Sequence, residues 1–291
     1  MLDLSRRLTT VLFLAVAVFG AAAMPGVARA DVMAEIAERG LLRVGTSLNL
    51  PWAMRDTREE LIGFEIDNAG RLATDLGVAL DIVELPFDGL LEALENGTVD
   101  VVAAGLSVTP ERARRVAFST AYMTADVAVI VRVADLVEHH DIIGLNDPGV
   151  TVAAVAGTTT EIAALHNLPG ASLQLFDTVG ASIDAFLAGE VTVLVGETPI
   201  PELLLLENPD VFTTLPEALL SSSQAFAVRR DEFAFRTFLD NWVTAYETAG
   251  ILDSARQYWF GSDEWLGRLA EPLVEATIAT GADSTAPAAA Q

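Results

Sequence analysis

Residues 97–112 have the sequence GTVDVVAAGLSVTPER and contain the pattern that decides the fold. Leucines at helical spacing precede this stretch, and Gly97 is a typical helix end. The run from Val99 to Ala104 is mostly apolar and lacks alternation, which is typical of a strand buried on both faces of a parallel sheet. A polar loop follows at Gly105. The stretch therefore predicts a helix, a buried strand and a loop in succession, as in α/β proteins.

The end of this stretch predicts a short helix with an unusual charge. Thr109 is a good N-cap, Pro110 suits the first helical position, and Glu111 suits the positive end of the helix dipole. Arg112 falls in the first turn, where a cation is disfavoured by a few tenths to about 1 kcal/mol. A bound carboxylate explains this cation, because a guanidinium offers it two parallel hydrogen bonds. The alternative is an ordinary ion pair between Arg112 and a surface acid.

The second half of the chain repeats this construction. Residues 189–197 (GEVTVLVGE) again combine a glycine, an apolar strand and a polar residue. Strands alternating with helices predict an α/β fold, and the repeat predicts two α/β lobes. Apolar segments at 127–133 and 225–228 are expected to be crossover strands that join the lobes. Further expected strands are 41–45, 78–85, 150–155 and 191–195, and expected helices lie in 31–40, 64–76 and 183–188, around 90–94, from 157 onward, and in 231–249 and 252–260.

The two ends of the chain are expected to lie outside the fold. Residues 1–30 have the features of an export signal: two arginines, an apolar run, and small residues before a cleavage site at Asp31. The alternative is an uncleaved membrane anchor. We therefore expect an exported, periplasmic protein. Residues 279–291 have the composition of a disordered tail. The predicted first lobe comprises 31–128 and 226–278, and the predicted second lobe, with its hinge strands, is 129–225.

The composition excludes several classes of protein. Of 291 residues, 52% are hydrophobic, and 41 acidic against 17 basic residues give a net charge of −24. Such a charge repels nucleic acid phosphates. The sequence contains no cysteine, which excludes thiol catalysis, disulfides and cysteine-bound metals. Every basic residue is arginine, so Schiff-base lysines and the P-loop lysine are excluded as well. We expect no metal and no cofactor.

Polar residues in the second half also lie where a ligand could bind. Thr158 and Glu161 have the spacing of a capping box, and Thr159 offers a hydroxyl group near a helix start, where anions bind. A plain helix cap is the alternative. Glu197 follows the apolar strand 191–195 at its carboxyl end, which faces the crevice in an open α/β sheet, and its carboxylate suits an ammonium group. A solvated loop acid is the alternative there.

Three residues of the first half complete the candidate site. Ser47 and Trp52 follow the first strand, and Phe64 begins the next helix. An aromatic ring beside a cleft can stack on a ligand, although core packing is its ordinary role.

Together these segments resemble family 3 of the bacterial extracellular solute-binding proteins, the periplasmic receptors of polar amino acid ABC importers. The similarity covers about residues 40–262. The stretches that carry it are LRVGT (42–46), GFEID (63–67), FDGLL (87–91), GTVDVV (97–102), GLSVTPER (105–112), FS (118–119), VAGTT (155–159) and WFG (259–261).

The resemblance implies a periplasmic binding protein-like fold of type II, in which two α/β lobes joined by two strands close on a ligand. It also implies a monomer that delivers its ligand to an ABC permease. Many members have an aspartate at the position of Ser47 that selects basic side chains, so this chain departs from a lysine or arginine site. The candidate residues are Arg112, Ser107, Gly105 and Thr159 for an α-carboxylate, Glu197 (usually aspartate in the family) for an α-ammonium, and Phe64, Ser47, Trp52 and Thr158 around them.

Two other functions remain open on the same scaffold. Periplasmic cyclohexadienyl dehydratases resemble this family, and residues 231–250 are similar to their C-terminal helix too. Fold alone does not decide function. Since the sequence offers no convincing catalytic acid beyond Glu197, we expect a binding protein rather than an enzyme. A free partner of a signalling receptor is the third possibility.

Overall fold

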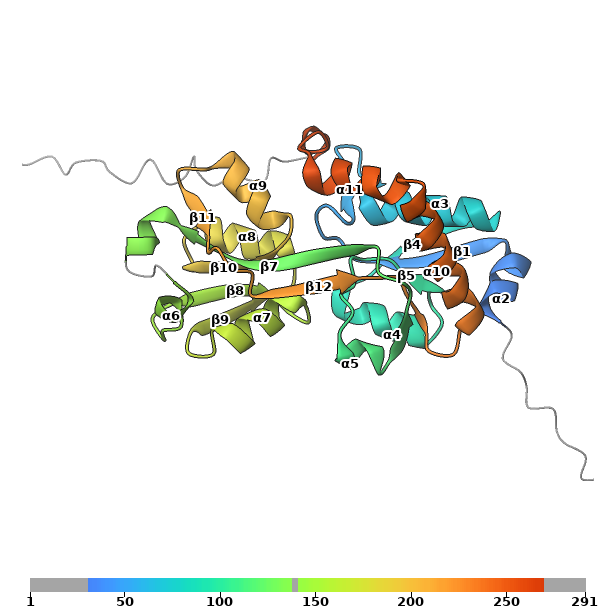
Figure 1. The fold of residues 1–291 in the computed structure, drawn as a ribbon, viewed down its shortest axis with the longest axis horizontal. Coiled ribbons are helices and arrows are strands. Elements are labelled where there is room, and N and C mark those ends of the chain that lie inside the picture. Colours follow the sequence, from blue (N-terminus) through green and yellow to red (C-terminus); the bar gives the residue numbers. More distant parts are fainter. Residues whose placement is uncertain (1–30, 138–140, 270–291) are drawn as a thin grey trace, which may run out of the picture. The chain divides into compact units, whose positions relative to one another are not determined.

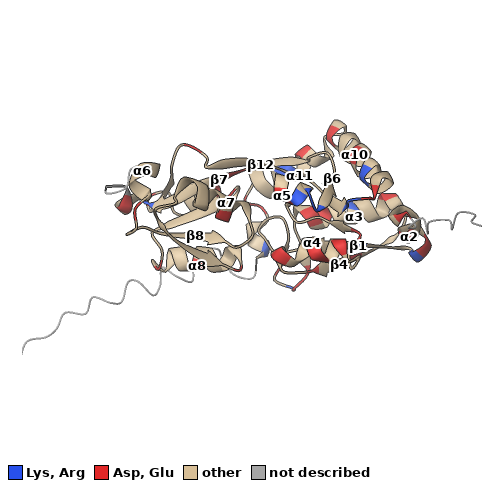
Figure 2. Ribbon diagram, turned by 90° about the horizontal axis from the view of Figure 1, so that it is seen from below, with Lys and Arg blue, Asp and Glu red and all other residues tan. Residues whose placement is uncertain are grey.

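The computed structural model describes residues 31–137 and 141–269. The predicted export signal at 1–30 and the predicted tail at 279–291 lie outside these residues. The described residues from Val32 onward belong to one compact unit, and acidic residues outnumber basic ones along its ribbon (Figure 2). Within the described ranges, no helix has the length and hydropathy needed to cross a membrane.

The first sheet has five strands in the order β4-β1-β5-β13-β6. Strand β1 is parallel to its neighbours β4 and β5, whereas β13 is antiparallel to β5 and β6. Because β13 comes from the C-terminal part of the chain, that part returns to the first sheet. The strands are β1 (Leu41–Thr46), β4 (Ala79–Glu84), β5 (Val101–Val102), β6 (Val116–Phe118) and β13 (Ala227–Arg229).

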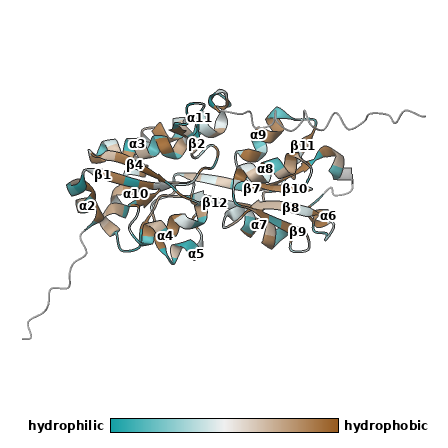
Figure 3. Ribbon diagram, turned by 180° about the vertical axis from the view of Figure 1, so that it is seen from behind, coloured by the Kyte–Doolittle hydropathy of each residue, from teal (hydrophilic) through white to brown (hydrophobic). Residues whose placement is uncertain are grey.

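Helices cover both faces of the first sheet, and we call this assembly the first lobe. Val101 and Ala103 pack in one core cluster with α2, α3, α10 and α11, whereas Val102 and Ala104 pack in another with α4. Successive strand residues point to opposite faces, so a sheet covered on both sides needs an apolar run without alternation. Individual helices such as α3 carry both hydrophobic and hydrophilic residues (Figure 3). The helices are α2 (Val32–Arg39), α3 (Phe64–Leu76), α4 (Leu90–Glu95), α10 (Phe233–Thr248) and α11 (Ile251–Gly261).

The second sheet has the order β11-β7-β10-β8-β9, with β12 also paired to β7. With its helices it forms the second lobe. Val193 and Val195 pack with α7, and Leu194 between them packs with α8 and α9, so this sheet is also covered on both faces. The strands are β7 (Met123–Arg132), β8 (Thr151–Val155), β9 (Ser172–Phe176), β10 (Val193–Glu197), β11 (Phe212–Thr214) and β12 (Leu220–Gln224), and the helices are α7 (Thr159–Asn167), α8 (Val179–Leu187) and α9 (Ile200–Glu207).

Two short segments connect the two sheets. One runs from β6 to β7, and the other runs from β12 to β13. They lie side by side, because the Tyr122 N–H donates to Gln224 O at 3.0 Å and the Ser119 N–H donates to Phe226 O at 2.9 Å. Figure 1 shows the paired strands β7 and β12 at this crossing.

The two connecting segments differ in detail from the sequence prediction. The first was predicted at 127–133, but β7 begins at Met123 and belongs to the second sheet. The second, predicted at 225–228, is preceded by β12, whose sequence LSSSQ carries no strand signal. Strand β5 is shorter than the predicted run 99–104. The remaining elements are β2 (Met54–Arg55), β3 (Leu61–Ile62), η1 (Phe87–Gly89), α5 (Pro110–Ala113), η2 (Val133–Val137), α6 (Ile142–Leu145) and η3 (Leu266–Arg268).

Candidate functional site

Arg112 lies in the first turn of α5, as predicted. Thr109 Oγ1 accepts a hydrogen bond from the Arg112 N–H at 3.2 Å. The Arg112 side chain is buried, and Nη1 donates to Ser107 O at 2.9 Å while Nη2 donates to Gly157 O at 2.9 Å. Because Gly157 belongs to the second lobe, the Arg112 guanidinium links the two lobes.

The buried guanidinium of Arg112 has neutral hydrogen-bond partners. No ion pair within the described ranges includes Arg112, so the alternative of a surface ion pair is wrong. Its Cζ lies 5.3 Å from the centroid of the Phe87 ring. Burial lowers the pKa of Arg112, while the negative charges of Glu197 and Glu111 raise it. A buried cation bound by carbonyl oxygens keeps its charge available for an anionic ligand.

The turn at residues 157–161 begins α7 with a shifted version of the predicted capping box. Thr158 Oγ1 accepts from the Thr160 N–H at 3.2 Å. Glu161 Oε2 accepts from the Gly157 N–H at 2.7 Å, whereas a capping box would use the N–H of Thr158. Thr159 is buried, and its hydroxyl donates to Glu197 Oε1 at 3.3 Å. The turn therefore delivers a hydroxyl group to Glu197 and a carbonyl oxygen to Arg112.

Glu197 ends β10 and points toward the first lobe. Its Oε1 accepts hydrogen bonds from Thr159 Oγ1 and, at 3.2 Å, from Gln224 Nε2. Burial raises its pKa from 4.5 to about 7, although Thr159, Arg112, Gln224 and Ser107 each lower it. Glu197 is half-buried at the end of a strand and is hydrogen-bonded to two side chains, so the alternative of a solvated loop acid is wrong. At neutral pH the carboxyl group of Glu197 is divided between its protonated and ionised forms.

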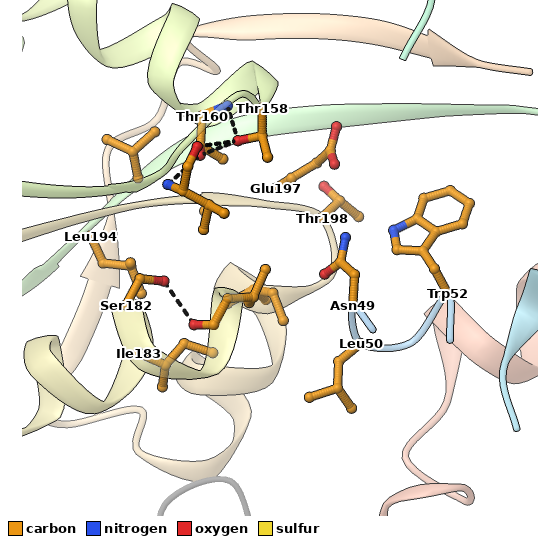
Figure 4. A pocket seen from close by; sticks show the side chains of 15 residues that line it. Asn49, Leu50, Trp52, Thr158, Thr160, Ser182, Ile183, Leu194, Glu197 and Thr198 are labelled. Carbon is orange, nitrogen blue, oxygen red and sulfur yellow. Dashed lines mark hydrogen bonds between the residues drawn. The ribbon is translucent and has the colours of Figure 1, made fainter. Parts of the chain in front are cut away.

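A pocket beside Glu197 is lined by residues of both lobes. The Trp52 ring and Asn49 come from the first lobe and lie opposite Glu197 and Thr158 (Figure 4). The cavity is about 30 Å³, enough for about two water molecules. A larger space of about 590 Å³ adjoins it and is lined by Ser47, Asn49 and Thr158 among others. The remaining lining of the smaller cavity is mostly apolar: Leu50, Val155, Val179, Ile183, Leu194, Val195 and Ile200.

The structure corrects the expected role of Phe64. Its side chain is 0% exposed, and its ring packs edge-on against Trp52 at a centroid distance of 5.7 Å and against Phe260 at 5.4 Å. Phe64 therefore belongs to the core behind the pocket, because the ring of Trp52 lies at the pocket wall. Ser47 lines the larger space and not the cavity beside Glu197.

Two residues near the site were missed by the sequence analysis. The fully buried Gln224 donates to Glu197, and Glu65 Oε1 accepts from the Gly105 N–H at 2.8 Å and from the Tyr122 hydroxyl. Burial raises the pKa of Glu65 to about 7. Because Glu65 uses the Gly105 N–H, that group does not donate to a ligand, contrary to the expected help from the Gly105 backbone. No local pattern distinguishes either residue from an ordinary polar side chain.

Gly105 lies against the pocket wall, and replacing it by alanine is expected to destabilise the protein. Its φ is +59°, and a Cβ atom there would lie 2.6 Å from Trp52 Cδ2. Gly77 is a matched control, since its φ is +69° but a Cβ atom would meet nothing within 4 Å. Gly77→Ala should lose about 1 kcal/mol of unfolding free energy, and Gly105→Ala about 2 kcal/mol more. Equal losses in denaturant titrations would contradict the contact with Trp52.

The fold and the site together define a class of protein. Two α/β lobes, two connecting segments and a pocket that both lobes line are the features of type II periplasmic binding proteins. The described residues contain no group of three or more side chains suited to hold a metal ion. The model of the bacterial extracellular solute-binding proteins, family 3, matches residues 42–262, and the chain belongs to this family. The resemblance drawn from its motifs is thus confirmed.

Similar proteins include both an enzyme and binding proteins. Cyclohexadienyl dehydratase of Pseudomonas aeruginosa is 26% identical over 226 residues, which are 77% of this chain and 84% of that protein. A probable arginine-binding protein of an ABC transporter from Chlamydia trachomatis is 28% identical over 220 residues, 74% of this chain and 84% of that one. A solved ancestral amino acid-binding protein, described as a precursor of cyclohexadienyl dehydratase, is 31% identical, with a TM-score of 0.72 over 79% of this chain and 99% of that chain.

Proposed function

We propose that the protein binds a small zwitterionic α-amino acid, or a close analogue, between its two lobes. The observation that carries this proposal is that the Arg112 guanidinium and the Glu197 carboxyl group come from different lobes, yet each charge shifts the pKa of the other group. An α-amino acid has a carboxylate and an ammonium group on one carbon atom. Its two charges therefore complement the two poles of this site.

Arg112 is the residue that we propose binds the carboxylate of the ligand. A guanidinium has five N–H donors, and two of those on Arg112 meet Ser107 O and Gly157 O. The other donors suit a carboxylate, in the paired geometry that guanidinium groups favour. The Thr159 hydroxyl, which lies on the other lobe, is a further donor once it turns from Glu197.

The same arrangement makes binding depend on lobe closure. The cavity beside Glu197, about 30 Å³, is smaller than an amino acid, and the space of about 590 Å³ that adjoins it is lined by both lobes as well. A ligand that reaches Glu197 therefore fits best if the lobes separate and then close around it. Arg112 or Glu197 alone supplies only part of the energy that binds the ligand. A ligand that touches both lobes therefore favours the closed form over the open one.

We further propose that the protein acts in the periplasm as the receptor of an ABC-type amino acid importer. Family membership, the relative from Chlamydia trachomatis and the features of residues 1–30 support this role. In this role the partner is a permease in the inner membrane, which recognises the closed form. The apolar lining near Trp52 and the serine at position 47 favour an uncharged ligand side chain over lysine or arginine.

A thermal-shift panel on residues 31–291 tests this function. The panel contains the proteinogenic amino acids, small organic acids and compatible solutes. An amino acid at about 100 times its Kd should raise the melting temperature by about 5–10 °C, because it binds only the folded state. A response to organic acids or compatible solutes alone, or to no compound, would contradict the proposal.

A lyase of the cyclohexadienyl dehydratase type is the second candidate function. The observation that favours it is the pKa of about 7 at Glu197, since such a carboxyl group can donate a proton at neutral pH. The similarity to the dehydratase from Pseudomonas aeruginosa also supports it. Incubation with prephenate or arogenate discriminates the two functions. Steady decarboxylative turnover that disappears in Glu197→Gln would replace the receptor role by an enzymatic one.

A further inference from the structure

We propose that Gln224 is a ligand-binding residue, whose side-chain oxygen accepts a hydrogen bond from the ammonium group that Glu197 binds. This inference rests on the proposed function and adds a residue that selects for the amino group of the ligand. Gln224 ends β12 beside the segment that joins the two sheets, at a point where it forms a β-bridge to Ser107.

The amide nitrogen of Gln224 contacts side chains of both lobes. It is 3.2 Å from Glu197 Oε1 in the second lobe and 3.4 Å from Ser107 Oγ in the first, with Ser222 Oγ also at 3.2 Å. Three acceptors thus surround an NH₂ group that has two hydrogens. The donor capacity of this amide is therefore fully used.

The amide oxygen of Gln224 is in the opposite situation. The residue is 0% exposed, and Oε1 is buried without a hydrogen-bond partner. Buried polar atoms normally have a partner, and an unpaired one requires an explanation. Rotating the amide by half a turn would not solve this, because Nε2 would then occupy the buried position that has no partner.

A ligand ammonium group supplies the missing donor. Oε1 and Nε2 share one carbon atom, so Oε1 lies next to the Glu197 carboxyl group that Nε2 contacts. An ammonium group has three N–H donors, more than one carboxylate oxygen can accept. With Glu197 taking one N–H and Gln224 Oε1 another, the last buried acceptor of this network is satisfied. A ligand with a hydroxyl group in place of the ammonium has one donor and cannot serve both acceptors.

A cycle of one protein change and one ligand change tests this contact. The probes are L-alanine with L-lactate and L-phenylalanine with L-phenyllactate, and calorimetry measures their affinities for wild-type protein and Gln224→Met. Methionine has a similar length and volume, no donor, and only the weak acceptor of its thioether sulfur. We expect Gln224→Met to lower the affinity for the amino acid about 10-fold and the affinity for the hydroxy acid less than about 3-fold. A merely structural role would weaken both members of a pair equally, and that result would overturn the inference.

Two further variants keep the test decisive. Gln224→Glu retains an acceptor oxygen, so it should bind the amino acid at least 10 times more tightly than Gln224→Met does. Ser222→Ala is the matched control, because Ser222 contacts Nε2 and not Oε1, and it should change both ligands of a pair alike. If Gln224→Met does not fold, the comparison uses the two other variants. A lower affinity for the amino acid in Gln224→Glu than in Ser222→Ala then overturns the inference. If wild-type protein binds no amino acid, the proposed function itself fails, which is a different outcome.

Discussion

Replacing Arg112 by alanine is expected to weaken the binding of an amino acid by about 100-fold or more, equivalent to about 3 kcal/mol. The guanidinium is the buried cation of the site, and its removal leaves a ligand carboxylate without a charged partner. Arg112→Lys should recover only part of the affinity, since an ammonium group cannot form the paired hydrogen bonds of a guanidinium. Calorimetric titration with the most stabilising amino acid of the panel measures both changes.

The control for this experiment is Arg115→Ala. Arg115 lies three residues further along, is exposed, and donates two hydrogen bonds of 2.8 Å to Glu95. Exposed pairs of this kind contribute about 1 kcal/mol or less, so the variant should fold and bind like the wild-type protein. Equal affinities of Arg112→Ala and Arg115→Ala would remove the carboxylate role of Arg112. Circular dichroism of the unliganded variants checks that both remain folded.

The affinity for an amino acid should fall steeply below neutral pH. Binding an ammonium group needs the ionised form of Glu197, whose pKa burial raises to about 7. Each pH unit below this value lowers the ionised fraction about tenfold, so the affinity at pH 5 should be about 100-fold weaker than at pH 8. The ligand remains a zwitterion over this range. Titrations at half-unit intervals give the apparent pKa of the unliganded site.

The stability of the unliganded protein should change in the opposite direction. Glu65 and Glu197 have a pKa of about 7 in the folded protein and 4.5 ordinarily, so the folded state binds their protons more tightly. The unfolding free energy is then greatest below about pH 4.5 as far as these groups are concerned, and it falls as pH rises toward 7. Glu65 alone accounts for about 3 kcal/mol of this change. Weak binding at pH 5 is therefore not explained by partial unfolding through these two groups.

Two glutamine variants separate the carboxyl groups. Glu197→Gln should bind amino acids weakly at every pH, with a flat profile of affinity. Glu65→Gln should retain the pH profile of affinity and lose about half of the pH dependence of stability that the two groups cause, because their pKa values are raised equally. A steep profile of affinity in Glu197→Gln would show that another group controls binding. The candidate would then be Glu65, which contacts the N–H of Gly105 near Ser107.

Most elements of the fold follow from local patterns in the sequence. The runs at 99–104 and 191–195 lack alternation because each sheet is covered on both faces. Consecutive strand residues are then all buried, so the sequence shows a continuous apolar run. The cap at Thr109 and the helix end at Gly77 were predicted because a helix terminus is determined by its own few residues. Strand β12 was missed, since its serines pair with β7 only through tertiary context.

The sequence by itself determined the class of fold, the family, and the two charged candidates Arg112 and Glu197, because each follows a strand or begins a helix in a recognisable pattern. Only the tertiary structure decided that the Arg112 guanidinium reaches Gly157 of the other lobe, that Glu197 meets Thr159 and Gln224, and that Trp52 and not Phe64 lines the pocket. Gln224 and Ser107 are 117 positions apart and meet through a hydrogen bond. Contacts of this kind depend on how distant segments pack, and no periodicity or spacing along the chain records them.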